Sequence, residues 1–336
     1  MMTSRNIEMM NKNKRAFSMI ELVFAILILG IVSSLGSSLI VKTFESYIVQ
    51  RAVHKASVAT ELAVTQIVNR ITFRIPRTTV ARNPSAPFDF LPVSSISSNG
   101  DTIHVALEWY AYDNDSFSAT KIPGWSAYAD TISPNSTMAQ FETPGSDLNT
   151  TDTIINNLSG GRVDLTGGGA VRPAIFFRAV DSKYDDANTF IHQYQPSCMG
   201  LDYAAFDNNC VLAVSGIHSN AAHDIFNFTD ATRSGESKYI YEHYKFAWSA
   251  YAVVPEQETD FDNTNPLYQL KLYYNYQPWL GNKYTDNSTS SSVLLRNVSV
   301  FKFSESGGTM RIKLCVQENI GETDNVTICK EKAVIR

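Results

Sequence analysis

A single carboxylate, Glu21, lies inside an apolar run that extends from Phe17 to Val41. A charged side chain at the centre of a bilayer costs about 2.5 to 3.5 kcal/mol, so an acidic residue in such a run indicates a functional role that requires a partner. Glu21 is also close to the start of the run, from where its carboxylate can reach the membrane interface. The residue type alone leaves both interpretations open.

The sequence patterns of common catalytic sites are missing from the rest of the chain. There is no HExxH, paired CxxC or GxSxG, and the glycine-rich stretch 160–170 lacks the Lys and the following Ser or Thr of a phosphate-binding loop. His218 and His223 are five residues apart, a spacing that does not place them on one helix face, so ordinary loop histidines are favoured over metal ligands. We predict no enzymatic activity, no metal site and no cofactor.

Two oxygen-rich stretches are the candidates for a calcium site. Neither has the ligand spacing of an EF-hand loop, so solvated acidic loops are favoured over calcium binding in both. Their side chains are Asp113, Asn114 and Asp115 in the first stretch, and Glu256, Glu258, Asp260 and Asp262 in the second.

The apolar run is the one membrane element that the sequence predicts. It has about 25 residues, enough to cross the roughly 30 Å hydrocarbon core. Lys12, Lys14 and Arg15 precede it, so the N-terminus is expected in the cytoplasm and the chain after about Lys42 on the other side of the membrane. The 336 residues carry a net charge of −5, which gives no basic surplus for general nucleic-acid binding.

The segment around the start of the run resembles the class III signal of type IV pilins and type II secretion pseudopilins. The matching residues are Lys14-Arg15-Ala16 followed by Phe17-Ser18-Met19-Ile20-Glu21. The resemblance implies that a prepilin peptidase cuts between Ala16 and Phe17 and that the new N-terminus is methylated. Ala16 stands where the family usually has Gly, which bears on the efficiency of cleavage.

The same resemblance implies an assembly role for Glu21. In the family, the glutamate of an incoming subunit neutralises the N-terminal ammonium of its neighbour, here that of Phe17. Two buried charges that are each costly alone become tolerable when they are paired and hydrogen-bonded.

The chain is predicted to divide into four segments. Residues 1–16 form the cleaved leader, 17–41 the transmembrane half of a long helix, 42–75 its amphipathic half, and 76–336 the exported domain. Helix propensity around the end of the membrane half is weakened by Gly30 and Gly36 and by the nearby Ser33, Ser34, Ser37 and Ser38. This stretch is suited either to unwinding in a filament or to close helix contacts in the membrane.

The exported domain reads as a series of strands separated by Gly, Pro, Asn, Asp and Ser clusters, with no second long helix. The expected fold class is α+β, a long N-terminal helix packed on a mostly antiparallel β-rich domain. Residues 77–170 resemble no known segment. The strand runs are 102–112, 174–180, 210–217, 246–254, 267–276, 292–303, 309–317 and 326–335.

Four cysteines in an exported domain favour disulfides, and proximity in sequence favours the pairs Cys198 with Cys210 and Cys315 with Cys329. Crossed pairings and free thiols remain as alternatives.

The strand pattern from Trp248 onward resembles the J-type minor pseudopilin and the W-type minor pilin. That resemblance implies a minor subunit that primes or caps a type IV pilus or a type II secretion pseudopilus. Its partners would be other major and minor subunits, the prepilin peptidase and the assembly platform of the bacterial inner membrane. Its globular domain would lie in the periplasm or at the tip of a filament. The alternative is a filament-displayed binding module, an adhesin or a DNA-uptake protein, although scattered Lys and Arg residues make nucleic acid an unlikely ligand.

Overall fold

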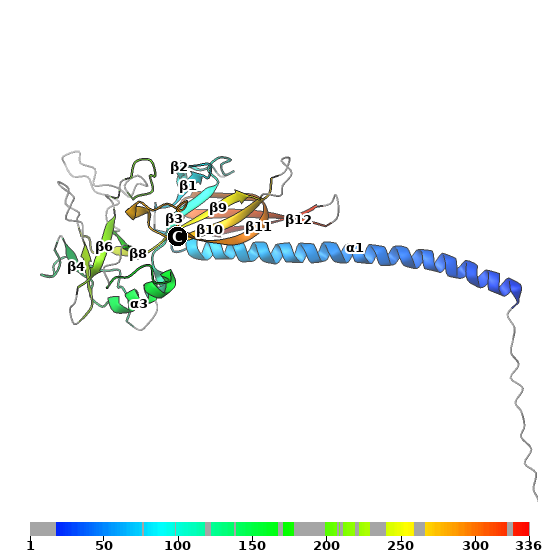
Figure 1. The fold of residues 1–336 in the computed structure, drawn as a ribbon, viewed down its shortest axis with the longest axis horizontal. Helices are drawn as coiled ribbons and strands as arrows, with labels where there is room; N and C mark the ends of the chain where they lie inside the picture. Colours follow the sequence, from blue (N-terminus) through cyan, green and yellow to red (C-terminus); the bar gives the residue numbers. More distant parts are fainter. Residues whose placement is uncertain are drawn as a thin grey trace, which may run out of the picture. The chain divides into compact units, whose positions relative to one another are not determined.

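The computed structural model describes most of the chain from Ser18 to Ile335 (Figure 1). It divides into two compact units, one ending at Val53 and one beginning at His54, and each is described by itself. The described residues are 18–75, 77–97, 99–117, 122–137, 139–166, 171–177, 199–206, 208, 211–218, 222–228, 240–258, 266–320 and 325–335.

The first unit consists of the N-terminal part of helix α1 (Met19–Ile71). Its large apolar side chains, from Met19 to Ile48, are all at least half exposed. The Gly- and Ser-rich stretch 30–41 is helical throughout, so its unwinding in a filament stays a prediction. A helix that is apolar all round and exposed all round requires lipid or protein partners.

The rest of α1 packs within the second unit on the larger of two sheets. Its buried residues fall at helical spacing and form one face: Ala56, Thr60, Ala63, Val64, Ile67 and Ile71. The helix ends at Ile71, earlier than the predicted end near residue 75. There Arg74 donates to the Ile71 carbonyl at 3.3 Å, and its side chain is 2% exposed.

The larger sheet is antiparallel throughout and has eight strands among the described residues. Across the sheet the order is β13, β12, β11, β10, β9, β3, β1, β2. The strands are β1 (Val80–Asn83), β2 (Ala86–Pro92), β3 (Ala106–Tyr110), β9 (Ala250–Gln257), β10 (Tyr268–Tyr276), β11 (Ser290–Ser306), β12 (Thr309–Asn319) and β13 (Asn325–Val334). Leu107, Leu272 and Ile312 are among the residues that form one core with the buried face of α1.

The smaller sheet has five antiparallel strands in the order β4, β7, β6, β5, β8. They are β4 (Gln140–Glu142), β5 (Ala174–Phe177), β6 (Leu212–Ile217), β7 (Ile225–Phe228) and β8 (Tyr244–Ala247). Short helical turns lie at η1 (Val93–Ser95), α2 (Asn114–Phe117) and η4 (Pro278–Leu280). The α+β prediction is confirmed, and every predicted strand run overlaps an observed strand; the run 246–254 is divided between β8 and β9.

Helix α3 (Leu148–Ser159) has 12 residues and was not predicted from the sequence, although no second helix as long as α1 is present among the described residues. Asp147 accepts from the backbone N–H of Thr150 at its start, and Gly160 adopts the left-handed conformation at its end. The helix buries Leu148, Thr151, Ile155 and Ser159 at helical spacing. Its Asn and Thr content gives low intrinsic helix propensity, so tertiary packing stabilises a segment that local preference disfavours.

A two-residue connection joins the sheets, because β8 of the smaller sheet ends at Ala247 and β9 of the larger sheet begins at Ala250. On the neighbouring strand β10 the register shifts between Tyr273 and Tyr276, which leaves one extra residue in that strand. Asn275 lies in this bulge with φ 60°, and its backbone N–H donates to Ser249 Oγ at 2.9 Å. The bulge therefore lies beside the connection between the sheets.

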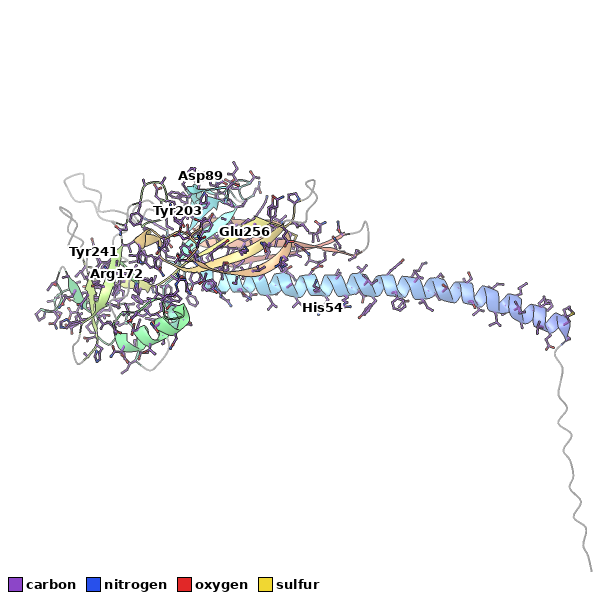
Figure 2. All side chains as sticks on the ribbon, in the orientation of Figure 1. His54, Asp89, Arg172, Tyr203, Tyr241 and Glu256 are labelled. Carbon is purple, nitrogen blue, oxygen red and sulfur yellow. A yellow bond between two sulfur atoms is a disulfide. The ribbon has the colours of Figure 1, made fainter. Side chains whose placement is uncertain are left out.

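A buried ion pair crosslinks the larger sheet. Arg82 on β1 pairs with Glu108 on β3, and the two side chains are 0% and 1% exposed. Tyr203 and Tyr276 donate to Glu108 Oε1 at 2.6 and 2.8 Å. The Arg82 guanidinium also donates to the carbonyl of Leu201 and stacks on the Tyr203 ring, which Figure 2 labels. Burial raises the pKa of both tyrosines, so they remain neutral donors.

Breaking this pair tests its contribution to stability. Glu108→Leu leaves Arg82 charged and buried, and we expect the free energy of unfolding to fall by about 3 to 5 kcal/mol. Arg82→Met together with Glu108→Leu is expected to cost less than Glu108→Leu alone, because no unpaired charge remains. Denaturant unfolding of the detergent-solubilised protein measures both.

The exposed pair Lys55–Glu318, whose lysine is 72% exposed, provides the control. Lys55→Ala is expected to change stability by at most about 1 kcal/mol. An equal loss from Lys55→Ala and Glu108→Leu would contradict the assignment.

Candidate assembly site and the N-terminal motif

Helix α1 begins with a capping interaction around Ser18. The Ser18 carbonyl accepts from the backbone N–H groups of Glu21 and Leu22 at 3.0 and 3.1 Å, and Ser18 Oγ accepts from Glu21 N–H at 3.3 Å. Ser18-x-x-Glu21 has the pattern of a capping box, which places a glutamate at the third helical position. This cap was not predicted, although a Ser three residues before a Glu at the start of an apolar run is its usual sequence signal.

Glu21 therefore lies in the first turn of the helix with an exposed side chain. The partial positive charge of a helix N-terminus stabilises a carboxylate at this position. Within the described residues Glu21 forms no ion pair. Ala16 and Phe17 lie outside the described residues, so the cleavage position and the pairing of Glu21 with the Phe17 ammonium stay predictions.

The surface that follows Glu21 is suited to lipid. Among the described residues one helix, α1, is long and apolar enough to cross a membrane. Figure 2 shows its side chains projecting on all sides of the ribbon. The helix hydrogen bonds satisfy the backbone internally, which is the condition for crossing hydrocarbon.

The C-terminal cysteines are joined by a disulfide in the structure. Cys315 on β12 and Cys329 on β13 are direct cross-strand partners, and a bond connects their sulfur atoms. Cys198 and Cys210, the other predicted pair, lie outside the described residues. A loop of the size closed by Cys315 and Cys329 stabilises a protein by about 3 kcal/mol in the chain-entropy description.

Peptide mapping tests the pairing of all four cysteines. Free thiols are alkylated first, and the protein is then digested without a reductant. We expect one disulfide-linked pair of peptides that contains Cys315 and Cys329, and another that contains Cys198 and Cys210. Replacing Cys315 and Cys329 together by Ala is expected to lower the free energy of unfolding by about 3 kcal/mol. Four alkylated thiols, or a peptide that links Cys198 to Cys315, would refute the local pairing.

The first of the oxygen-rich stretches has a structural role. Asp113 is buried and accepts from the backbone N–H of Ser116 at 3.3 Å and from the Ser116 hydroxyl, which caps helix α2. Burial raises the pKa of Asp113 to about 6. Asp115 is exposed. Asp113 therefore stabilises the helical turn α2 through its hydrogen bonds to Ser116.

The second oxygen-rich stretch is described as far as Glu258, and Asp260 and Asp262 lie outside the described residues. Glu256, labelled in Figure 2, pairs with Lys271 Nζ at 2.6 Å, and Glu258 lies 4.0 Å from Arg296. His218 and His223 lie at the end of β6 and just before β7. Among the residues that the structure describes, no three His, Cys, Asp or Glu side chains gather as a metal site would require.

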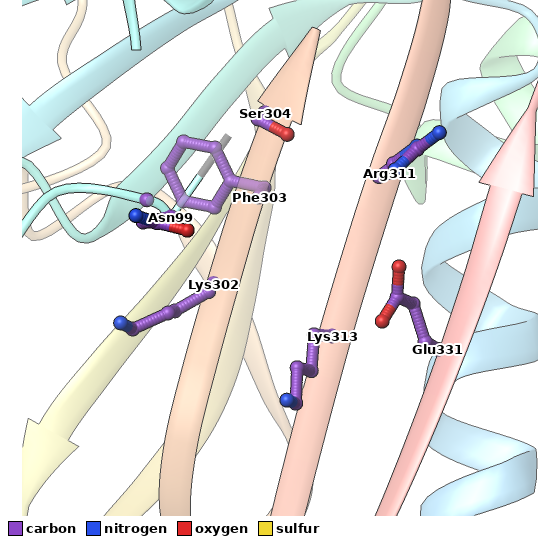
Figure 3. A pocket seen from close by; sticks show the side chains of 8 residues that line it. Asn99, Lys302, Phe303, Ser304, Arg311, Lys313 and Glu331 are labelled. Carbon is purple, nitrogen blue, oxygen red and sulfur yellow. The ribbon is translucent and has the colours of Figure 1, made fainter. Parts of the chain in front are cut away.

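Strand pairing gathers three cations that are scattered in the sequence. Lys302 lies opposite Lys313, and Glu331 lies across Lys313 on β13. Together with Arg311 they line a hollow of about 300 Å³ (Figure 3). This basic hollow is a local exception on a chain with a net charge of −5.

Comparison with known proteins bears on the N-terminal segment. Residues 11–37 match a family described as the prokaryotic N-terminal methylation motif. No curated protein and no solved structure matches the chain. The matched motif and the apolar helix that contains most of it support a type IV pilin-like protein. They support a structural subunit with a membrane anchor, and the motif implies prepilin-peptidase processing and contact with other pilin subunits in general.

Proposed function

We propose that this chain is a minor pilin or pseudopilin subunit that helps to prime or cap a filament. The observation that carries the proposal is the methylation motif at residues 11–37, joined to a helix whose apolar surface has no cover within its own compact unit. Such a helix gains stability by insertion into lipid and by packing against the helices of other subunits. The C-terminal strand pattern favours a J-type pseudopilin or a W-type pilin.

In this proposal Glu21 is the residue that selects its neighbour. Before assembly its carboxylate lies in the first turn of α1, where the helix dipole and the nearby interface reduce its cost. In a filament, the Phe17 ammonium of an adjacent subunit would neutralise it. An ion pair in a low-dielectric surrounding requires close geometry, so pairing would also fix the axial position of one helix against the next.

The proposed topology follows from the same segment. Residues 1–16 form a cytoplasmic leader that is removed, residues 17–41 span the bacterial inner membrane once, and the domain from residue 76 onward faces the periplasm. Residues 42–75 connect the membrane half to that domain as an amphipathic helix. Lys12, Lys14 and Arg15 orient the segment.

Processing is the first test of the proposal. In cells that contain a prepilin peptidase, we expect the mature chain to begin at N-methylated Phe17. Mass spectrometry of the N-terminal peptide measures this, and a strain without the peptidase should retain the leader. A mature chain that begins at Met1, or at a position beyond Val41, would overturn the proposal.

Glu21→Gln tests the assembly mechanism. The mutant helix carries no charge and should insert in the membrane at least as readily as the wild type. The neighbour's ammonium then lacks its partner, which typically costs about 3 to 5 kcal/mol for a buried pair. We expect a processed, membrane-resident protein that no longer cross-links to or co-purifies with other filament subunits.

Glu45→Gln is the matched control, because Glu45 is an exposed glutamate of the same helix outside the proposed membrane half. It removes the same charge and is expected to leave assembly unchanged. Normal assembly of Glu21→Gln would show that Glu21 acts only as a capping residue at the membrane interface.

The basic hollow bears on the DNA-uptake alternative. Its three cations lie beside one carboxylate, Glu331, whereas strongly salt-dependent DNA binders make about six to ten phosphate contacts. The hollow is therefore small for a nucleic-acid surface. We propose assembly, and not nucleic-acid binding, as the main function.

A further inference from the structure

The connecting segment 99–104, which leads into β3, contacts two separated strands of the larger sheet. Near its start, the backbone of Gly100 packs on the aliphatic stem of Lys302 on β11, where an added Cβ would lie 3.1 Å from Lys302 Cδ. At its end, His104 reaches Asp89, a residue of the edge strand β2 that is labelled in Figure 2. The connecting segment is therefore held to the sheet at both ends.

The imidazole of His104 lies between two carboxylates. Its Nδ1 is 3.2 Å from Asp101 Oδ2, and its Nε2 is 3.2 Å from Asp89 Oδ2. The side chain of His104 is only 11% exposed, so water has little access to replace either carboxylate. A neutral imidazole carries one N–H group, whereas the protonated ring carries two. Only the protonated ring can therefore offer a proton to both carboxylates.

The contact between His104 and Asp89 depends on the charge of the ring. His104 Nε2 is within ion-pair distance of Asp89, but it has no hydrogen-bond partner in the described part of the chain. The contact with Asp101 is different, because Asp101 is fixed independently: its Oδ1 accepts from the backbone N–H of Ile103 at 2.7 Å. A neutral ring can keep its hydrogen bond to Asp101, whereas Asp89 then loses its cation.

The charged groups around the connecting segment favour the protonated ring. Burial lowers the pKa of His104, but the interactions with Asp89 and Asp101 outweigh burial and raise this pKa above its ordinary value of 6.5. The charged group that β11 presents to the segment is Lys302, whose stem makes the contact with Gly100. Since folding raises the pKa of His104, its stabilising contribution is complete below about pH 6.5 and is lost as the pH rises through the raised pKa.

We propose that His104 is a pH-sensitive latch that holds the connecting segment 99–104 to β2 while its ring is protonated. Loss of the ring proton releases Asp89, and the segment then separates from β2 at its His104 end. The other end stays attached, because the Gly100 N–H donates to the Ser97 carbonyl at 2.9 Å in a bond that no titratable side chain makes. The latch does not depend on the assembly role of Glu21.

Opening of the latch changes the basic hollow. Asn99 and Gly100 line this hollow together with Lys302 and Lys313, so the connecting segment forms part of its wall (Figure 3). When His104 is neutral, the wall is held at one end only, and the lysines become more accessible to solvent and to an anionic partner. Acid therefore closes the wall beside the lysines, and mild alkali loosens it.

Titration of the histidine ring signals by NMR is the first test, on the full-length protein in detergent. The sequence has six histidines, and the signal that is missing from the His104→Gln variant identifies His104. We expect His104 to titrate with a pKa above 6.5, and Asp89→Asn to move that pKa back toward 6.5, because one of the two carboxylates is then uncharged. A wild-type pKa at or below 6.5, or no change in Asp89→Asn, would overturn the proposal.

Amide hydrogen exchange measures the opening itself. Exchange is compared at pH 6 and pH 8.5 after correction for the intrinsic effect of pH on exchange. We expect the protection of residues 99–104 to be about two- to fivefold lower at pH 8.5, the size of effect expected for a partly exposed ion pair. The protection of β12 should be the same at both pH values, which separates local opening of the segment from unfolding of the domain.

His104→Gln should abolish the pH response, because glutamine does not titrate in this range. His218→Gln is the matched control, since His218 is an exposed histidine at the end of β6, in the other sheet. It should keep the wild-type response. Equal protection of the wild-type segment at both pH values, or a pH response that persists in His104→Gln, would contradict the latch. If His104→Gln does not fold, the wild-type titration and the Asp89→Asn variant still decide.

Discussion

The packing of one helical face on the larger sheet is the constraint on which the second unit depends. Ala56, Ala63, Val64 and Ile67 are almost completely buried and form a single core with residues of β3, β10 and β12. Small and β-branched residues along this face allow close approach of helix and sheet. Arg74 then holds the end of the helix to the β11–β12 hairpin through Glu305 at 3.1 Å and the Gly308 carbonyl at 3.0 Å.

Sequence patterns were sufficient for the features that depend on local periodicity. The apolar run and the alternating strands near the C-terminus extend over many residues, so tertiary context does not overturn them. Helix α3 was missed because its Asn- and Thr-rich residues form a helix only when Leu148 and Ile155 can be buried. The ion pair of Arg82 and Glu108 joins positions 26 residues apart, and the basic hollow collects residues from distant segments. No local pattern encodes such neighbours.

The acidic residues Glu108 and Glu21 are placed in two different environments. Glu108 is surrounded by donors from Arg82, Tyr203 and Tyr276, so its burial is satisfied within one subunit. Glu21 has an exposed side chain and no ion pair within the described residues. A satisfied buried charge specifies one conformation of its own domain, whereas a carboxylate that awaits a partner is suited to recognition between subunits.

The disulfide of β13 restricts how this subunit can exchange structure with another. β13 is an edge strand whose one partner in the larger sheet is β12, and the bond from Cys315 to Cys329 fastens the two. Some filaments assemble by lending a terminal strand to the sheet of the next subunit. A strand that is covalently attached to its own sheet cannot be lent without reduction. Lys330 and Glu331 further discourage addition of a foreign strand at this edge, because charged residues on an edge disfavour strand pairing. While the disulfide is intact β13 is not available for donation to another sheet, and its charged residues independently disfavour addition of a strand at this edge.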